Sequence, residues 1–207
     1  MKTTIKIAQD GPFLIENLEL LSDTNGTEYE KKDKMALCRC GASQNKPFCD
    51  GSHVAAEFSG KKDRAEKYDT LEFAGDEITV IDNIGICSHA GECVKNSPSV
   101  FFSWEGEKRI SNPNETSKDE IIETIKKCPS GSLAYKLDHK LHDEYFSREE
   151  IFIEKDGPLH VRGGIALTGD SSKELISKEH FTLCRCGASK NKPFCDGTHK
   201  KINFKAD

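Results

Sequence analysis

One segment of this chain of 207 residues occurs twice, and the repetition limits the folds that the chain can adopt. The pattern Cys-x-Cys-x8-Cys-x3-His covers residues 38–53 and again residues 184–199, with fourteen of sixteen positions identical. The same offset of 146 residues aligns an Asp-Gly-Pro sequence at residues 10–12 with another at residues 156–158. Whole units are therefore repeated, rather than the motif alone.

The repeated units, residues 1–60 and 147–207, are each too short to bury a large hydrophobic core. Each is predicted to contain a strand, at residues 5–8 and 151–154, and then an Asp-Gly-Pro turn, a second strand, a polar loop and the cysteine-containing loop. We expect the two units to pack on each other as a pseudo-dimer within one chain, as two identical chains would around a twofold axis. The protein is then expected to be a monomer.

Between the units, residues 75–138 are predicted to form a different small domain. The sequence Ile-Thr-Val-Ile at residues 78–81 indicates a strand. Ser117-x-x-Glu120 is a capping box that opens a helix, and this helix should end before Cys128-Pro129 because proline cannot continue it. The predicted fold class is α+β, with two small β-rich units forming an intramolecular pseudo-dimer and an α+β domain between them in sequence.

The composition of the chain limits the cellular compartment and the kinds of partner that we expect. Lys and Arg total 30 and Asp and Glu total 35, so the net charge is −5 and a nucleic-acid partner is not expected. The first residues contain no long apolar run and no Arg- and Ser-rich stretch, so we expect a soluble, cytoplasmic protein that does not bind a membrane. Nine cysteines, an odd number without a secretory signal, argue against a disulfide framework.

The nine cysteines form three triplets, and each repeated motif adds one histidine. Three thiolates and one imidazole suit zinc or an iron–sulfur cluster. The Cys-x-Cys spacing is tighter than that of a zinc knuckle and suits one iron of a [2Fe–2S] cluster, with the later cysteine and the histidine holding the other iron. A structural zinc site is the alternative. The candidate ligands are Cys38, Cys40, Cys49 and His53 in the first motif, and Cys184, Cys186, Cys195 and His199 in the second.

Both motifs resemble the CDGSH iron–sulfur (NEET-type) family. Its pattern places Ser or Thr, Pro and Asp-Gly-Ser/Ala/Thr between the ligands, and the matching residues here are Ser43, Pro47, Asp50, Gly51 and Ser52, and Ser189, Pro193, Asp196, Gly197 and Thr198. The resemblance implies a [2Fe–2S] cluster on three cysteines and one histidine in each motif, together with redox activity and cluster lability. With two motifs and no anchor, the chain resembles the soluble tandem type. Asp50 and Asp196 are expected to cap a short helix.

The third triplet is Cys87, Cys93 and Cys128. A bacterial [4Fe–4S] site has the spacing Cys-x2-Cys-x2-Cys…Cys-Pro, and Ala90 stands here where its middle cysteine would be. Residues 75–138 resemble the divergent mono-cluster ferredoxin domains, which implies a ferredoxin-like α+β fold. Three thiolates fit a [3Fe–4S] cluster, and His89 or a water is the alternative fourth ligand of a [4Fe–4S] cluster.

A histidine ligand has a consequence for pH dependence. Imidazole binds iron only when its coordinating nitrogen is unprotonated. We therefore expect both CDGSH clusters to become labile in acid. The other histidines (His139, His142, His160 and His180) are expected to be exposed, and three aromatic residues (Phe101, Phe102 and Trp104) are expected in the core of the middle domain.

The predicted function is electron transfer by two [2Fe–2S] clusters and one [3Fe–4S] or [4Fe–4S] cluster. The alternatives are an iron–sulfur cluster donor or pH/redox sensor, and a zinc-stapled interaction module. The partner would be a redox protein or an apo-protein that accepts a cluster. The sequence contains no Ser-His-Asp arrangement, Walker loop or dinucleotide fingerprint, so we do not expect an enzyme.

Overall fold

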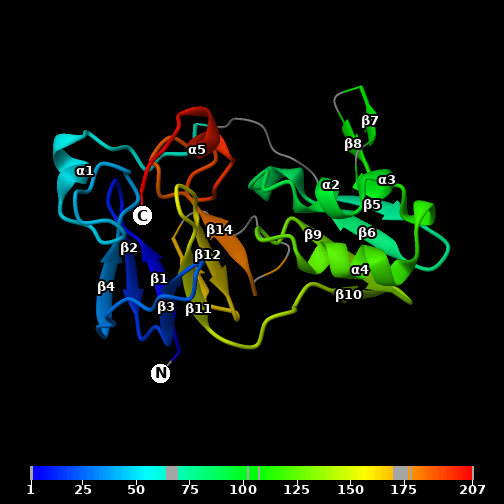
Figure 1. Cartoon of the computed structure of the whole chain (residues 1–207), viewed down its shortest axis with the longest axis horizontal. Helices are drawn as coiled ribbons and strands as arrows, with labels where there is room; N and C mark the ends of the chain where they lie inside the picture. Colours follow the sequence, from blue (N-terminus) through cyan, green and yellow to red (C-terminus); the bar gives the residue numbers. More distant parts are fainter. Residues whose placement is uncertain are drawn as a thin grey trace.

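The computed structural model shows a mixed α+β protein built from small sheets and short helices, as the sequence predicts. The two repeated units lie side by side, and the middle domain forms a separate body next to the second unit (Figure 1). The described residues are 2–63, 70–101, 103–106, 108–169, 177 and 179–206. Within them, no helix is long and apolar enough to cross a membrane.

Each repeated unit contributes one strand to the sheet of the other. Ile5 pairs with Leu167 in parallel, and Ile151 pairs with Leu21 in parallel, so the two exchanges obey the same 146-residue offset. This exchange closes the pseudo-dimer through backbone hydrogen bonds as well as side-chain packing. The first sheet has the order β13 (Ala166–Thr168), β1 (Thr4–Ile7), β2 (Phe13–Glu16) and β4 (Lys34–Leu37), and the second has β14 (Phe181–Leu183), β12 (Leu159–Arg162), β11 (Glu150–Ile153) and β3 (Leu20–Asp23).

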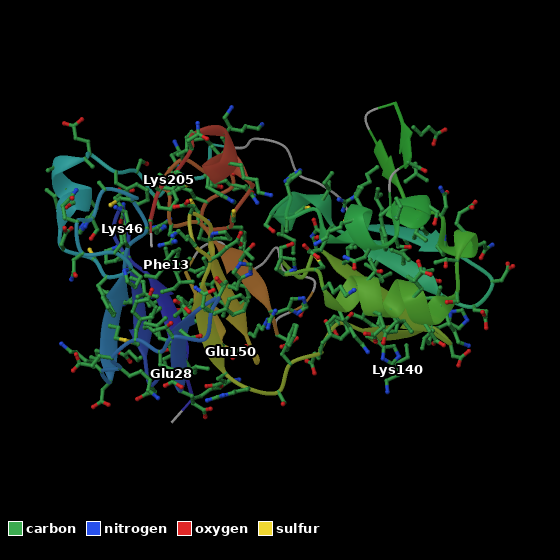
Figure 2. All side chains as sticks on the ribbon, in the orientation of Figure 1. Phe13, Glu28, Lys46, Lys140, Glu150 and Lys205 are labelled. Carbon is green, nitrogen blue, oxygen red and sulfur yellow. The ribbon has the colours of Figure 1, made fainter. Side chains whose placement is uncertain are left out.

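One hydrophobic core serves both units. In β2, Phe13 and Ile15 are buried while Leu14 and Glu16 are exposed, which is the alternation of a strand with one face toward a core. Figure 2 shows Phe13 inside this core. Aliphatic residues from both copies meet there, so the pseudo-dimer solves the burial problem that each short unit has alone.

The middle domain has its own sheet and core. Ser117 Oγ accepts a 3.3 Å hydrogen bond from Glu120 N, so the predicted helix start is confirmed. Ile121 and Ile125 from this helix are fully buried against the sheet. The sheet order is β10 (Lys140–His142), β9 (Leu133–Leu137), β6 (Thr79–Asp82) and β5 (Leu71–Ala74). A separate hairpin consists of β7 (Ser103–Glu105) and β8 (Lys108–Ile110). The helical elements are α2 (Glu92–Asn96), α3 (Pro98–Phe101), α4 (Lys118–Lys126) and the 3₁₀ turns η1 (Ile84–Ile86) and η2 (Pro113–Glu115).

The prediction of exposed histidines is wrong at two positions. His160 is 6% exposed because its ring stacks on Phe152 and bonds Glu154, and His180 is 0% exposed. His139 is exposed as predicted, and His142 is half-buried. An isolated histidine carries no sequence signal that distinguishes a stacked position from a solvated one.

The aromatic core prediction is confirmed in part. Phe101 is 1% exposed and lies in the core of the middle domain. Phe102 lies outside the described residues. Only the backbone of Trp104 is described, within β7, so the prediction for its side chain stays untested.

Candidate iron–sulfur centres

Each metal-binding loop leaves the end of a strand and is folded back by backbone hydrogen bonds. In the first unit, Cys38 N donates to Pro47 O at 2.8 Å, and Cys49 N donates to Ala36 O at 2.8 Å. These bonds bring the third cysteine of the motif back beside the first two. The second unit repeats them, from Cys184 N to Pro193 O at 2.8 Å and from Cys195 N to Thr182 O at 3.1 Å.

The candidate ligands of each motif are arranged as two pairs. Cys38 and Cys40 have their sulfur atoms 3.8 Å apart, and Cys49 Sγ lies 3.5 Å from His53 Nδ1. The corresponding distances in the second motif are 3.6 and 3.4 Å. Two thiolates bound to one tetrahedral metal lie about 3.8 Å apart, and a thiolate and an imidazole nitrogen lie about 3.5 Å apart. Each pair therefore fits two ligands of one metal ion.

The pairs do not merge into a single four-donor cage. Within the described part of the chain, no group of three or more His, Cys, Asp or Glu side chains is arranged to hold one metal ion. A structural zinc site needs four donors around one point. Each motif therefore offers two pairs of donors, and the spacing within each pair fits two ligands of one metal ion.

The aspartate that recurs in both motifs ties each loop together. Asp50 accepts hydrogen bonds from Ser52 N at 3.0 Å and Gln44 N at 2.7 Å. Hydrogen bonding by the Ser52 side chain, together with these two backbone bonds, holds the pKa of this exposed carboxyl well below its usual range. Asp196 makes the equivalent bonds to the second loop. The N-cap of helix α1 (Ser52–Ala55) is Gly51, not Asp50, because a left-handed residue separates the aspartate from the helix. The capping prediction is corrected accordingly, and helix α5 (Thr198–Lys201) begins in the same way after Gly197.

The two metal-binding loops pack against each other. A β-carbon on Gly41 would lie 2.5 Å from the carbonyl oxygen of Cys186, and Gly187 approaches the backbone of Cys40 in the same way. Both glycines have φ of +79°. Only glycine tolerates such a combination of positive φ and close backbone approach, so these two residues set the separation of the sites.

Sequence reasoning missed the arginine between the first two cysteines of each motif. Arg39 is 3% exposed and donates to Ala8 O at 3.0 Å and Gly60 O at 2.9 Å. Burial lowers its pKa, and the charge of Cys184 in the other unit opposes that effect. Arg185 has the matching relation to Cys38. The recurrence of arginine in both copies was the available signal.

Thiol pKa values reflect the packing of these sites. The hydrogen bond with Cys186 lowers the pKa of Cys184 to about 6 and raises that of Cys186. Burial raises the pKa of Cys195 and brings that of Cys93 to about 11. Thiolates at such buried positions need a compensating positive charge, which a metal supplies.

Cys87, Cys93 and Cys128 line one small cavity in the middle domain, together with Ala90. Their sulfur atoms have polar neighbours, since Cys128 Sγ lies 3.3 Å from Ser132 Oγ, and His89 N donates to Cys87 Sγ at 3.4 Å. His89 does not line this cavity. The structure thus brings the third triplet together, and the part of His89 as a fourth ligand stays a prediction.

A buried arginine faces the middle site. Arg109 Nη1 lies 3.8 Å from Cys87 Sγ, and its Nε donates to Asp82 Oδ2 at 2.6 Å. Asp82 is 2% exposed. Burial opposes the charge of Arg109, but its bonds to Asp82 raise its pKa, so it stays positive beside the thiols. Neither residue has a sequence signal, because 27 positions separate them.

The second CDGSH unit contacts the loop of the middle site directly. Asn191 Nδ2 donates to Gly85 O at 2.6 Å, and Lys200 Nζ donates to His89 O at 3.0 Å. A β-carbon on Gly197 would lie 3.1 Å from Ser88 O. The three candidate sites therefore adjoin in the order first unit, second unit, middle domain.

A cavity of about 290 Å³ lies at this junction, and His199 and Ala90 both line it. His160 lines it as well, with Nε2 2.8 Å from Glu154 Oε2. That bond lowers the pKa of Glu154. The candidate ligand His199 is thereby next to a charged side chain that the first unit lacks, because Ala8 occupies the position of Glu154 there.

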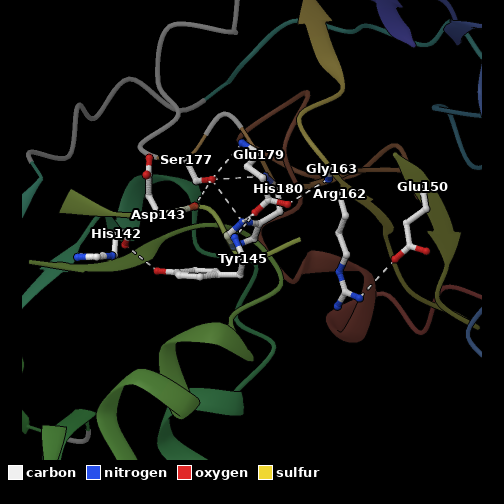
Figure 3. Close-up of polar contacts among 9 residues, drawn as sticks. All are labelled: His142, Asp143, Tyr145, Glu150, Arg162, Gly163, Ser177, Glu179 and His180. Atoms are coloured by element: carbon white, nitrogen blue, oxygen red, sulfur yellow. Dashed lines mark hydrogen bonds and ion pairs between the residues drawn. The ribbon is translucent and has the colours of Figure 1, made fainter. Parts of the chain in front are cut away.

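A polar network around Glu179 fastens the connector between the middle domain and the second unit (Figure 3). Glu179 accepts hydrogen bonds from Tyr145 N at 3.0 Å and Gly163 N at 3.1 Å, and its Oε2 lies 3.0 Å from His180 Nδ1. Ser177 Oγ donates to Asp143 O at 2.7 Å. Burial would raise the pKa of Glu179, but these partners lower it below the usual value.

Comparisons with known proteins agree with these sites. Residues 10–54 and 156–200 match the family described as iron-binding zinc finger, CDGSH type, and residues 73–138 match the divergent 4Fe-4S mono-cluster family. An uncharacterized protein, YjdI, of Escherichia coli K12 is 33% identical over 64 residues, which are 31% of this chain and 82% of that protein; YjdI of strain O157:H7 matches equally. No solved structure matches.

The fold and the donor sets define an iron–sulfur protein. The chain belongs to the CDGSH family, and between its two CDGSH units it contains a domain of the divergent 4Fe-4S mono-cluster family.

Proposed function

We propose that this protein is an electron carrier with three centres, two [2Fe–2S] clusters in the CDGSH units and one [3Fe–4S] or [4Fe–4S] cluster in the middle domain. The observation that carries the proposal is the adjacency of the three donor sets. The Gly41–Cys186 contact joins the first two, and the contact of Gly197 with Ser88 joins the second to the third. A chain that only stored clusters would not need its sites in a row.

The paired geometry supports [2Fe–2S] clusters in the CDGSH units. In this assignment Cys38 and Cys40 hold one iron, and Cys49 and His53 hold the other, as the sulfur–sulfur and sulfur–nitrogen distances of 3.8 and 3.5 Å favour. Cys184, Cys186, Cys195 and His199 form the second set in the same way. The histidine would bind through Nδ1, the ring nitrogen near the cysteine sulfur in both motifs.

In the middle domain, three thiolates favour a [3Fe–4S] cluster. Ala90, which has no donor atom, lines the cavity where a fourth cysteine would stand. The alternative is a [4Fe–4S] cluster with a water or His89 as the fourth ligand. His89 is exposed and is not among the residues that line this cavity.

When bound, the clusters would supply one-electron chemistry. The residues of this chain hold, shield and tune them. Arg39, Arg185 and Arg109 place positive charge near the thiolates, which stabilises the more reduced, more negative state. Gly41 and Gly187 let the backbones of the first two loops approach closely, which would keep the two clusters near each other.

One observation favours the alternative function, a cluster donor or pH/redox sensor. His53 is more exposed than His199, so the first site is open to exchange with an apo-protein or to protons. We also propose that the protein is a soluble cytoplasmic monomer and not an enzyme, with a redox protein or a cluster acceptor as its partner.

Incubation with an apo-ferredoxin tests carrier against donor. The purified protein, brown from its clusters, is mixed anaerobically with a fourfold excess of apo-ferredoxin and separated again. A carrier keeps its iron and its visible absorption even when the incubation lasts many times longer than a redox exchange. Transfer of iron and sulfide to the ferredoxin would support the donor function, and a colourless protein containing zinc would contradict both.

A further inference from the structure

The two CDGSH sites have nearly identical motifs but different surroundings. In the second unit, Asn191 is 1% exposed and His199 is 7% exposed. Their counterparts at the 146-residue offset are Asn45, which is exposed, and His53, which is half-buried. Sequence differences in the motif do not explain this asymmetry, because both residue types are the same in the two copies.

The middle domain accounts for the difference: among the described residues, it lies against the metal-site loop of the second unit and not against the equivalent loop of the first. Its loop around Ser88 and His89 lies against Gly197, so that a β-carbon there would contact both residues. At Gly51, the counterpart of Gly197, a β-carbon would meet nothing within 4 Å. The first unit therefore leaves exposed the surface that is equivalent to the one with which the second unit contacts the middle domain.

The uncovered surface differs from its covered counterpart in polarity. Val54 is 74% exposed where the second unit has Lys200, and Leu14 is 38% exposed where it has His160. Only four large hydrophobic side chains of the described residues are exposed, and these are two of them. We name this surface the open face and define it by Ala8, Leu14, Asn45, Gly51, His53 and Val54.

We propose that the open face is the docking site for a separate small iron–sulfur protein of the ferredoxin type. The proposal rests on the carrier function proposed above. The intramolecular interface is the template: Asn45 is free to donate to a backbone carbonyl of the partner's cluster loop, as Asn191 donates to Gly85, and Gly51 allows that loop close approach. Leu14 and Val54 give the apolar contact that centres of protein interfaces use.

A second copy of this chain does not fit the open face equally well. Its middle domain would have to present the loop at residues 85–89, which already contacts Asn191, Gly197 and Lys200 of its own second unit. A separate ferredoxin has its cluster loop free. In the encounter, one electron passes from the reduced ferredoxin to this protein, the ferredoxin becomes oxidised, and no covalent bond is formed or broken.

The test uses the loaded protein and a plant-type [2Fe–2S] ferredoxin, reduced anaerobically and freed of excess dithionite. Stopped-flow absorbance gives the second-order rate constant of electron transfer. Leu14→Lys with Val54→Lys should lower it about tenfold, because losing an apolar anchor weakens an interface by that order. The control is Leu141→Lys on β10, which removes an exposed hydrophobic residue (42% exposed) far from the open face, and it should leave the rate within about twofold.

Amide hydrogen exchange with the oxidised ferredoxin locates the contact independently of electron transfer. Protection of residues 44–54, but not of 190–200, is expected. Three results would each overturn the docking proposal. The first is an equal rate constant for all variants, and the second is protection at residues 190–200 instead of 44–54. The third is dimerisation of the chain, if Leu14→Lys with Val54→Lys abolishes it. Protection of 44–54 without any reduction would leave the docking site standing and contradict the carrier function. If the ferredoxin neither protects these residues nor reduces the protein, the docking proposal and the carrier function are both overturned.

Discussion

The backbone of Gly41 lies directly against the carbonyl of Cys186, so a cysteine loop of one CDGSH unit forms a wall of the site in the other. Gly187 and Cys40 repeat the relationship across the pseudo-twofold axis. The two sites are therefore not independent, and a change at one glycine should be felt at both.

Replacing Gly41 with alanine tests this coupling. The positive φ of 79° and the collision with Cys186 should together cost about 3 kcal/mol or more, and iron should be lost from both CDGSH sites. The matched control is Gly26→Ala, where φ is +85° but a β-carbon meets nothing within 4 Å. That variant should lose only about 1 kcal/mol. Urea unfolding and iron content measure both, and equal losses would mean that the close approach does not matter.

Replacing Arg109 with methionine should destabilise the middle domain. The change leaves Asp82, which is 2% exposed, as a buried charge without its partner, and such a loss costs about 3–5 kcal/mol. Pairing Arg109→Met with Asp82→Asn should recover most of that free energy of unfolding. Denaturant unfolding of both variants is the measurement. A double variant as unstable as the single one would show that the ion pair is not the cause.

Glu179 should make the free energy of unfolding depend on pH in the acidic range. Its hydrogen bonds lower its folded-state pKa below the unfolded value of about 4.3. The stabilisation is therefore present above that unfolded pKa and is lost as the pH falls toward the folded pKa. The facing groups are the titratable His180 and the guanidinium of Arg162. Glu179→Gln should flatten the dependence of unfolding free energy on pH between about 3 and 4.5. An unchanged slope would show that other carboxylates cause it.

Asn191 and Asn45 form a matched pair for the junction with the middle domain. Asn191→Ala removes the 2.6 Å bond to Gly85 O at a buried position and should cost about 1–3 kcal/mol. The exposed Asn45→Ala should change stability by less than about 0.5 kcal/mol. Amide exchange at residues 83–89 should accelerate only in the first variant. Acceleration in neither would mean that the junction is held by other contacts.

Much of this architecture can be predicted from sequence, because it depends on local patterns. The helix N-cap at Ser117, the Asp-Gly-Pro turns and the 146-residue offset are all short-range or repeated signals, and the structure contains each of them. The strand exchange of β3 and β13 could not be predicted. Alternating burial shows that a strand has an inner face, but it does not say which sheet the strand joins.

The asymmetry of the sites also escapes the sequence. The motifs differ at two of sixteen positions, so they predict equivalent sites. Burial of His199 comes from a domain placed against it by contacts such as Asn191–Gly85, which are 106 positions apart. The same holds for His180, whose burial depends on the network of Glu179 and Tyr145.

The iron content and the spin states of the iron show which clusters the three donor sets hold. Protein purified anaerobically is analysed for iron and acid-labile sulfide, and EPR spectra are recorded as isolated and after reduction. We predict about seven irons per chain, the sum for two [2Fe–2S] clusters and one [3Fe–4S] cluster, with an oxidised-state signal from the [3Fe–4S] cluster that reduction replaces by [2Fe–2S] signals. About eight irons and a silent oxidised state would mean a [4Fe–4S] centre in the middle domain. Zinc in place of iron would contradict the assignment of three iron–sulfur centres.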